Sequence, residues 1–275
     1  MTLPINEMSA RIEQKLPKMK FEDPNMTWND KVKHLGFKTQ IQRLGVIAEA
    51  FIEGEVPTSP SIQAVIEPND KRVSIISTHE QLLDGQVYNG CINPANKKYR
   101  TIIMDAGWKV GNYLAERGVV GHFSVDFLAN QGTDGSWDVH AVEVNLRQGG
   151  TTHPHAMMSL LCGGSMGSDG LFRNADGEVR TYIATDTYYN PHLKGCSENQ
   201  ILDAIECKTN TLANTIRWDT TKCIGVIFHL FKFVETHGRI GFTAIGRNDE
   251  EVQTFYDTVK QFLSDVGENP YMGNK

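Results

Sequence analysis

The residues best suited to chemistry are two carboxylates and an amide, Asp126, Glu143 and Asn145, which fall on two predicted strands. Between the strands lies Asp134-Gly135, a pair favoured in the two-residue type I′ turns of β-hairpins. A two-residue turn there places Asp126 directly opposite Glu143, with the two Cβ atoms about 5 Å apart on one face of the hairpin. Asn145 comes two residues later on its strand, so its side chain points to the same face.

Such a cluster of oxygen atoms suits Mg²⁺, which takes one or two protein carboxylates and completes its shell with phosphate and water. Without a cation, two carboxylates placed opposite each other repel and destabilise a sheet. The alternative interpretation is the solvated face of an edge hairpin, which is the more common setting for a lone Asp–Glu pair. The residues that follow the second strand favour the metal site.

A loop that could hold an anion comes directly after Asn145. Gly149, Gly150 and Thr151 offer backbone N–H groups and a hydroxyl to an anion. Arg147 is a permanent cation beside the predicted metal, fit to neutralise charge on a transferring phosphoryl group. The alternative here is a turn that carries a surface arginine.

The surrounding elements alternate between strands and helices and predict an α/β or α+β fold, with a mixed or antiparallel sheet covered by helices. Short β-rich runs predict strands at 45–54, 60–68, 71–81, 119–129, 136–146, 223–231 and 239–246. Helical spacing and capping residues predict helices at 99–117, from Ser197 to about Cys207, and after Asn248. Residues 163–180, rich in Gly, Asp and Asn, are expected to form a surface loop or lid.

Composition narrows the class of protein and its partners. The chain has 275 residues, a net charge of −6 and no basic cluster, which argues against nucleic acid as a partner. No apolar run approaches the roughly 20 residues that span a bilayer, so we expect no membrane partner. The five cysteines are scattered and form no CxxC pair, which argues against a disulfide framework or a zinc site. A cytoplasmic, reduced protein is the simplest interpretation.

The stretch DFLA…EVNLRQGGTTHP resembles the ATP-grasp superfamily, which holds its metals with an acidic residue on one strand and a Glu-x-Asn pair on the next. Within that superfamily, the sequence of this stretch is most similar to the pheganomycin-type peptide ligase branch. EAFIEGEVPTSPSIQ, STHEQLLDGQVYNGCINPA, KCIGVIFHLF and RIGFTAIG resemble that branch too, so the similarity runs from about Gly45 to the last helix. The resemblance implies an ATP-grasp-like α+β fold.

The resemblance also implies an activity and its ligands. ATP would phosphorylate a small carboxylate, and an amine from an amino acid or peptide would attack the acyl phosphate to give an amide or peptide bond. The metals would be two Mg²⁺ ions.

Residue roles carry over from the family position by position. Asp126, Glu143 and Asn145 would bind Mg²⁺, and Arg147 would face the phosphates or the acyl phosphate. Glu49, Ala50, Ile52 and Glu55 would bind the nucleotide, as residues of the interlobe strand that meets adenine and ribose. His79 and Gln81 lie in the STHEQ signature without an assignable role, while His153 is either a substrate contact or a buried structural imidazole.

The sequence departs from the family before Gly45. An ATP-grasp enzyme normally has a first lobe there, with a Gly-rich flap and two phosphate-binding lysines, but the 44 preceding residues contain no Gly-rich loop. We expect residues 1–44 to be a polar, helical remnant of that lobe and 45–275 to be the nucleotide- and metal-binding domain.

Three explanations remain open: a piece of a longer or split enzyme, assembly with a second chain that supplies the lobe, or a non-catalytic ATP-grasp-like module that serves as a binding or structural component of a larger assembly.

Overall fold

The computed structural model describes residues 14, 43, 58–85 and 87–268. The chain divides into two units, Met1–Ile52 and Glu53–Lys275, and the fold described below is that of the second. The strand expected at 45–54 and the boundary expected after residue 44 lie outside the described residues, so both stay predictions.

The sheet of the second unit begins with a hairpin of two strands, β1 (Pro60–Ile66) and β2 (Val73–Asp84). It continues with β3 (Val87–Asn93), β4 (Gly121–Gln131) and β5 (Trp137–Asn145). The later strands are β8 (Val179–Tyr189), β9 (Gly225–His229) and β10 (Arg239–Gly246). They lie in the order β5-β4-β1-β2-β3-β8-β10-β9, and each neighbouring pair is antiparallel.

Side-chain alternation on β4 gives this part of the sheet its two faces. Phe123, Val125 and Phe127 are buried and point to one side, where they pack with Ile62 of β1. The residues between them point to the other side, because successive side chains of a strand alternate. β4 therefore has one face packed in the core and an opposite face whose side chains are available to form a site.

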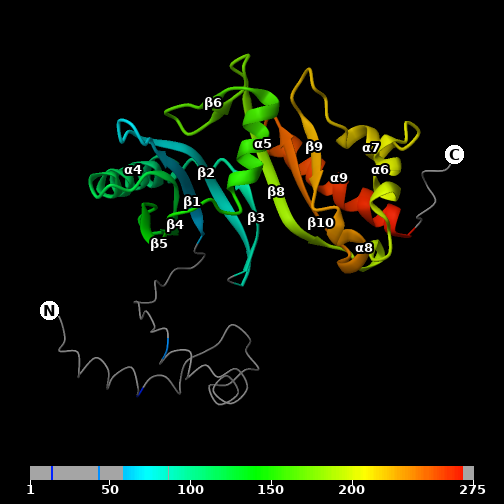
Figure 1. Cartoon of the computed structure of the whole chain (residues 1–275), viewed down its shortest axis with the longest axis horizontal. Coiled ribbons are helices and arrows are strands. Elements are labelled where there is room, and N and C mark those ends of the chain that lie inside the picture. The colour runs from blue at the N-terminus through cyan, green and yellow to red at the C-terminus, as the bar shows by residue number, and fades with distance from the viewer. Residues whose placement is uncertain (1–13, 15–42, 44–57, 86, 269–275) are drawn as a thin grey trace. The chain divides into compact units, whose positions relative to one another are not determined.

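The core face is covered by α4 (Arg100–Glu116), which lies across β1, β2 and β4 (Figure 1). Two buried glycines let the helix approach closely. A Cβ on Gly107 would lie 2.7 Å from Ile62 Cγ1, and one on Gly111 would lie 2.5 Å from Val73 Cγ1. The helix ends before Gly118, which has a positive φ of 81° that suits glycine, so the helix predicted at 99–117 is confirmed.

A second core lies where α9 (Asp249–Glu268) packs on β8 and β10. Asn248 accepts a hydrogen bond from the Glu251 backbone N–H, which confirms the predicted cap. The apolar stripe of α9 is buried as its spacing predicts, with Val252, Phe255, Val259, Phe262 and Leu263 in the core.

Smaller elements surround this core. They are η2 (Pro191–Leu193), α6 (Glu198–Glu206), α7 (Thr211–Ile216) and α8 (Lys232–His237). The helix predicted from Ser197 begins with a capping box, since Ser197 and Gln200 each bond the other's backbone N–H. The α+β architecture with an antiparallel sheet is thus confirmed.

Two segments differ from expectation. The stretch after Thr151 forms a helix, α5 (Thr152–Cys162), which the sequence analysis did not predict. Pro154 lies in its first turn, where the missing backbone N–H costs little. Residues 163–180 contain two short paired strands, β6 (Ser165–Met166) and β7 (Phe172–Arg173), and β7 pairs in turn with β8.

The hairpin between β4 and β5 has a different turn from the one predicted. Its loop holds three residues, because the Gly132 N–H bonds to the Ser136 carbonyl, and Gly135 adopts the left-handed conformation at φ 83°. A regular ladder from this loop would place Val142 opposite Asp126. A bulge after Asp126 shifts the register instead and restores the pair Asp126 with Glu143. The expected pairing is confirmed, while the expected two-residue turn is wrong.

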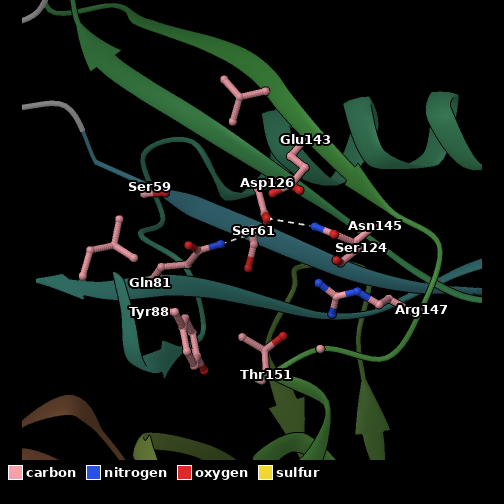
Figure 2. A pocket seen from close by; sticks show the side chains of 14 residues that line it. Ser59, Ser61, Gln81, Tyr88, Ser124, Asp126, Glu143, Asn145, Arg147 and Thr151 are labelled. Atoms are coloured by element: carbon pink, nitrogen blue, oxygen red, sulfur yellow. Dashed lines mark hydrogen bonds between the residues drawn. The ribbon is translucent and has the colours of Figure 1, made fainter. Parts of the chain in front are cut away.

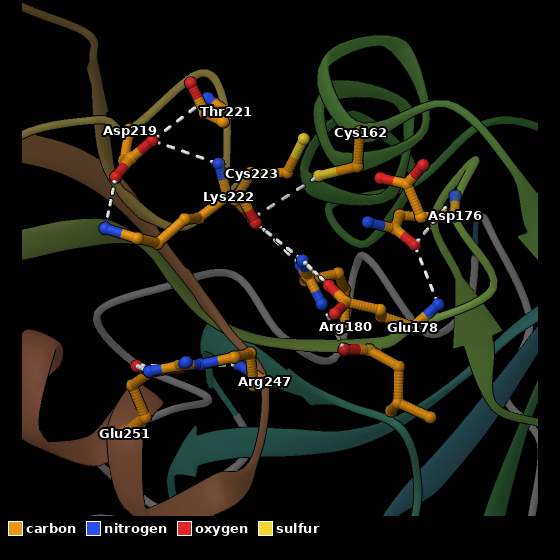
Figure 3. Close-up of polar contacts among 12 residues, drawn as sticks. Cys162, Asp176, Glu178, Arg180, Asp219, Thr221, Lys222, Cys223, Arg247 and Glu251 are labelled. Atoms are coloured by element: carbon orange, nitrogen blue, oxygen red, sulfur yellow. Dashed lines mark hydrogen bonds and ion pairs between the residues drawn. The ribbon is translucent and has the colours of Figure 1, made fainter.

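A buried arginine ties the loop before β9 to β8 (Figure 3). The side chain of Arg180 is only 1% exposed, and its guanidinium donates to the carbonyls of Lys222 and Cys223 at 2.5 and 3.1 Å. It also contacts Glu178 at 2.7 Å. On the same loop, Asp219 accepts from the Lys222 N–H and ammonium. These bonds hold the loop that leads into β9 against β8.

We expect Gly111→Ala to lower the free energy of unfolding by about 1–3 kcal/mol, because the new methyl group meets Val73 and Phe123 in a packed core. Alanine has the better helix propensity, so a change governed by propensity alone would stabilise the protein instead. Denaturant unfolding followed by circular dichroism measures the difference. Thr101→Ala, on the exposed side of α4, is the matched control and should change stability by less than about 0.5 kcal/mol.

Candidate active site

A cavity of about 500 Å³ lies over the polar face of β5, β4, β1 and β2 (Figure 2). Polar side chains from neighbouring strands form its floor, because the alternation that buries one face of β4 directs the other face here. The loop after β5 and Tyr88 of β3 form its walls. The lining residues are Ser59, Ser61, Gln81, Leu83, Tyr88, Ser124, Asp126, Val142, Glu143, Asn145, Arg147, Gly149, Gly150 and Thr151.

Asp126 is the centre of the polar cluster. Its two oxygens accept from Gln81 Nε2 at 2.8 Å and from Asn145 Nδ2 at 3.3 Å. Glu143 is its direct partner across the strand pair. Burial raises the pKa of the Asp126 carboxyl to about 6, and the facing Glu143 carboxylate adds to the rise, while Gln81 and Arg147 oppose it. The protein therefore holds a carboxylate in a place that disfavours its charge.

This donor set fits a magnesium ion. Asp126, Glu143 and Asn145 bring two carboxylates and an amide oxygen to one face, as the sequence predicts, and Mg²⁺ prefers oxygen ligands of this kind. The raised pKa of Asp126 supports the fit, because a cation would offset both the burial and the repulsion that disfavour its ionised form.

The predicted anion loop borders the same cavity. Arg147, Gly149, Gly150 and Thr151 all line it, and Figure 2 shows the Arg147 side chain directed inward over the strands. Thr151 is the N-cap of α5, so the positive end of that helix faces the cavity together with Arg147. The arrangement places cationic groups on one side of the cavity and the carboxylates on another.

Two contacts fix the anion loop against the sheet. The buried Gln63 side chain donates to the Thr151 hydroxyl, which joins β1 to the start of α5. The Tyr88 ring lies so close to Gly150 that a Cβ there would come within 2.6 Å of it. Glycine at this position is therefore required by close packing, besides any role in binding an anion.

Sequence reasoning left Gln81 and His79 without roles, and the structure separates them. Gln81 lines the cavity and bonds Asp126. His79 is fully buried and contacts the Tyr182 hydroxyl at 2.6 Å, and burial together with nearby His155 holds the pKa of its imidazole well below the usual value. His79 is a core residue. His153 does not line the cavity and contacts Asp186 instead.

Several lining residues escaped the sequence analysis. Ser61 and Ser124 sit on the same strand face as Asp126, and Ser61 pairs with it directly across β1 and β4. Alternation along the two predicted strands could have indicated both serines. Tyr88 gave no such signal, because its position depends on the pairing of β2 with β3.

The predicted nucleotide-binding residues lie outside the described residues and stay predictions; they are Glu49, Ala50, Ile52 and Glu55.

Within the described part of the chain, no helix combines the length and the apolar character needed to cross a membrane.

Similarity to known proteins identifies the family of this chain. Residues 6–169 match the family described as "IQCH-like, ATP-grasp". The chain belongs to this ATP-grasp family. The match begins before Gly45, where the resemblance was expected to start, and it includes the whole hairpin that carries Asp126 and Glu143.

A curated relative of this ATP-grasp chain is the L-propargylglycine–L-glutamate ligase of Streptantibioticus cattleyicolor, which is 31% identical over 228 residues. The alignment covers 83% of this chain and 45% of the relative, so the chain spans less than half of the relative's length. The predicted resemblance to the ATP-grasp superfamily is confirmed.

Solved structures of similar arrangement include an L-amino acid ligase from Bacillus licheniformis, with a TM-score of 0.48 and 16% identity, covering 83% of this chain and 58% of that one. Another is the N5-carboxyaminoimidazole ribonucleotide synthetase of Thermus thermophilus, with a TM-score of 0.48 and 12% identity, covering 84% and 58% of the two chains.

We expect Asp126→Asn to raise the melting temperature of the metal-free ATP-grasp chain by a few degrees at about pH 8. Because the folded-state pKa of Asp126 is raised to about 6 from 3.8, ionisation of this group costs stability that an amide does not lose. The advantage should shrink as the pH falls from about 6 to about 4, where the carboxyl becomes protonated in both states.

Thermal unfolding in the presence of a chelator, followed by circular dichroism at several pH values, tests this expectation. Asp203→Asn, on the exposed face of α6, is the control and should show no such pH-dependent gain. A melting temperature that Asp126→Asn leaves unchanged at about pH 8 would contradict the burial of an unfavourable charge.

Proposed function

We propose that this chain is the nucleotide- and metal-binding core of an ATP- and Mg²⁺-dependent carboxylate–amine ligase that acts through an acyl phosphate. One observation carries the proposal: a single cavity joins the oxygen cluster of Asp126, Glu143 and Asn145 with the cationic side formed by Arg147 and the loop before α5. Phosphoryl transfer needs this combination, because catalysis depends on positioning and on neutralising the phosphate charge.

The reaction would proceed in two displacements. A carboxylate oxygen of the first substrate attacks the γ-phosphorus of ATP, and ADP leaves with the electron pair of the broken P–O bond. The nitrogen of the second substrate then attacks the acyl carbon, phosphate leaves, and loss of a proton from nitrogen gives the amide.

The chain's own residues supply binding and charge in this scheme. Two Mg²⁺ ions would be held by Asp126, Glu143 and Asn145, and would neutralise phosphate charge when bound. The Arg147 guanidinium would contact the phosphoryl group in transfer, and the N–H groups around Gly149 and Thr151 would bind its oxygens. The bond from Gln63 to Thr151 would keep that loop in place during the reaction.

We propose amino acids or short peptides as the carboxylate and the amine, because the relative's name specifies two amino acids. We also propose that a second chain supplies further contacts to the nucleotide. A cytoplasmic location, with neither nucleic acid nor membrane as partner, accords with the acidic composition and with five free cysteines.

The first test is titration of the chain with a non-hydrolysable ATP analogue in excess Mg²⁺. We expect binding that requires Mg²⁺ and that weakens about tenfold or more, or about 1.4 kcal/mol, in a Glu143→Gln, Asn145→Ala variant. Asp138→Asn, also a change of a carboxylate on β5 but outside the cavity, should leave the affinity unchanged. Binding that ignores Mg²⁺ would favour the non-catalytic module, whereas no binding at all would mean either that module or a site that a second chain completes.

A second test addresses chemistry. With ATP and a mixture of amino acids, one labelled with ¹⁸O in its carboxylate, the acyl phosphate predicts transfer of label to the released phosphate. Arg147→Ala should lower the rate of phosphate release roughly 10²- to 10³-fold, the usual loss when a charge-stabilising donor is removed. Arg117→Ala, at the exposed end of α4, should not change it. Unlabelled phosphate from an active chain, whichever amino acid of the mixture carries the label, would exclude the acyl phosphate.

A further inference from the structure

A second cluster of ligand-type side chains lies outside the cavity. His153 from the first turn of α5, Asp186 from β8 and His229 at the end of β9 offer one ligand atom each, and the three atoms lie within 4.8 Å of one another. The closest pairs are Asp186 Oδ1 with His229 Nε2 at 3.0 Å and with His153 Nδ1 at 3.8 Å. Among the described residues, this group stands alone in bringing His, Cys, Asp or Glu together in threes.

Three separate elements hold these side chains in place. His229 pairs with Gly241 of β10, and a Cβ at that glycine would lie 2.2 Å from His229 Nε2, so only glycine leaves room for the ring in this position. The His153 and His229 rings meet edge to face, with centroids 4.3 Å apart. Two imidazoles are therefore packed together beside a single carboxylate.

Two of the three ligand separations are nearer to those around a zinc ion than to those around an ammonium group. Ligands about 2.0–2.1 Å from a tetrahedral zinc ion lie roughly 3.4 Å from each other. Acceptors around an ammonium group, about 2.8 Å from its nitrogen, lie roughly 4.6 Å apart. The observed 3.0 and 3.8 Å lie on either side of the zinc value and below the ammonium value.

We propose that His153, Asp186 and His229 form a site for a divalent transition metal ion of the zinc type, separate from the magnesium cluster. Two imidazoles and a carboxylate are a common protein ligand set for zinc, with the fourth position open to water or substrate. The His153 and Asp186 side chains are 40% and 31% exposed, which leaves an approach for the ion and for that fourth ligand. Magnesium favours oxygen ligands, so the two clusters select different metals.

The alternative is a plain hydrogen-bonded His–Asp pair, and the chain contains one for comparison. On β5, His140 Nε2 lies 2.9 Å from Asp138 Oδ2, nearly the same separation as in the cluster, without a third ligand. A His–Asp contact of this length is therefore insufficient evidence for a metal, and the two sites provide a matched test.

The experiment titrates the chelator-treated chain with Co²⁺ in excess Mg²⁺ and records visible absorption, which reports nitrogen and oxygen ligation. We expect saturable binding that Zn²⁺ displaces. Loss of one ligand, in Asp186→Asn or His153→Gln, should weaken Co²⁺ binding roughly 100-fold or more, beyond the 10- to 100-fold typical of changes behind a metal ligand. His140→Gln should leave the titration unchanged.

Other results would overturn the site. Absence of the Co²⁺ bands in the unsubstituted chain, or bands that survive both substitutions while circular dichroism shows an intact fold, would leave only the hydrogen-bonded pair. A near-ultraviolet thiolate-to-cobalt band would assign the ion to cysteine instead. Repeating the titration in the Glu143→Gln, Asn145→Ala variant separates this site from the proposed ligase chemistry, because cobalt binding should persist there.

Discussion

Burial of the Asp126 carboxylate opposite Glu143 is the constraint on which the site and its surroundings depend. The two carboxylates face each other across β4 and β5, where burial and mutual repulsion raise the pKa of Asp126 to about 6. The protein tolerates this cost because the opposite face of β4 is packed into the core under α4. The hydrogen bond from Gln81 and the charge of Arg147 offset part of it. The ionised form of Asp126, which the proposed Mg²⁺ site needs, is therefore the form that costs the fold stability.

The cationic side of the cavity is positioned by the same short stretch of chain. β5 ends at Asn145, Arg147 and the glycines follow within five residues, and α5 begins at Thr152. The buried bond from Gln63 to Thr151 returns this stretch to β1, which lies beside β4 in the sheet. Anionic and cationic groups are thus held by one strand–loop–helix unit, whose ends are both fixed to the sheet that carries Asp126.

The local parts of this arrangement could be predicted from sequence, and the long-range parts could not. Periodicity and capping residues predicted α4, α6, α9 and the strands around Asp126, because those signals depend on neighbouring residues. The helix α5 was missed, since Gly149, Gly150 and Pro154 resemble a loop until Pro154 is placed in a first turn. The contact between His153 and His229 requires α5 and the pairing of β9 with β10, which no local pattern contains.

The bulge beside Asp126 also affects how related sequences should be compared. It adds Val142 to β5 and thereby compensates for a hairpin loop one residue longer than a type I′ turn. Loop length and bulge are coupled, because each alone would turn Glu143 and Asn145 to the wrong face of the sheet. Alignments of this hairpin should therefore show compensating single-residue gaps, one between 132 and 136 and one between 141 and 143. A gap at only one of these places would mark a relative whose carboxylates no longer face each other.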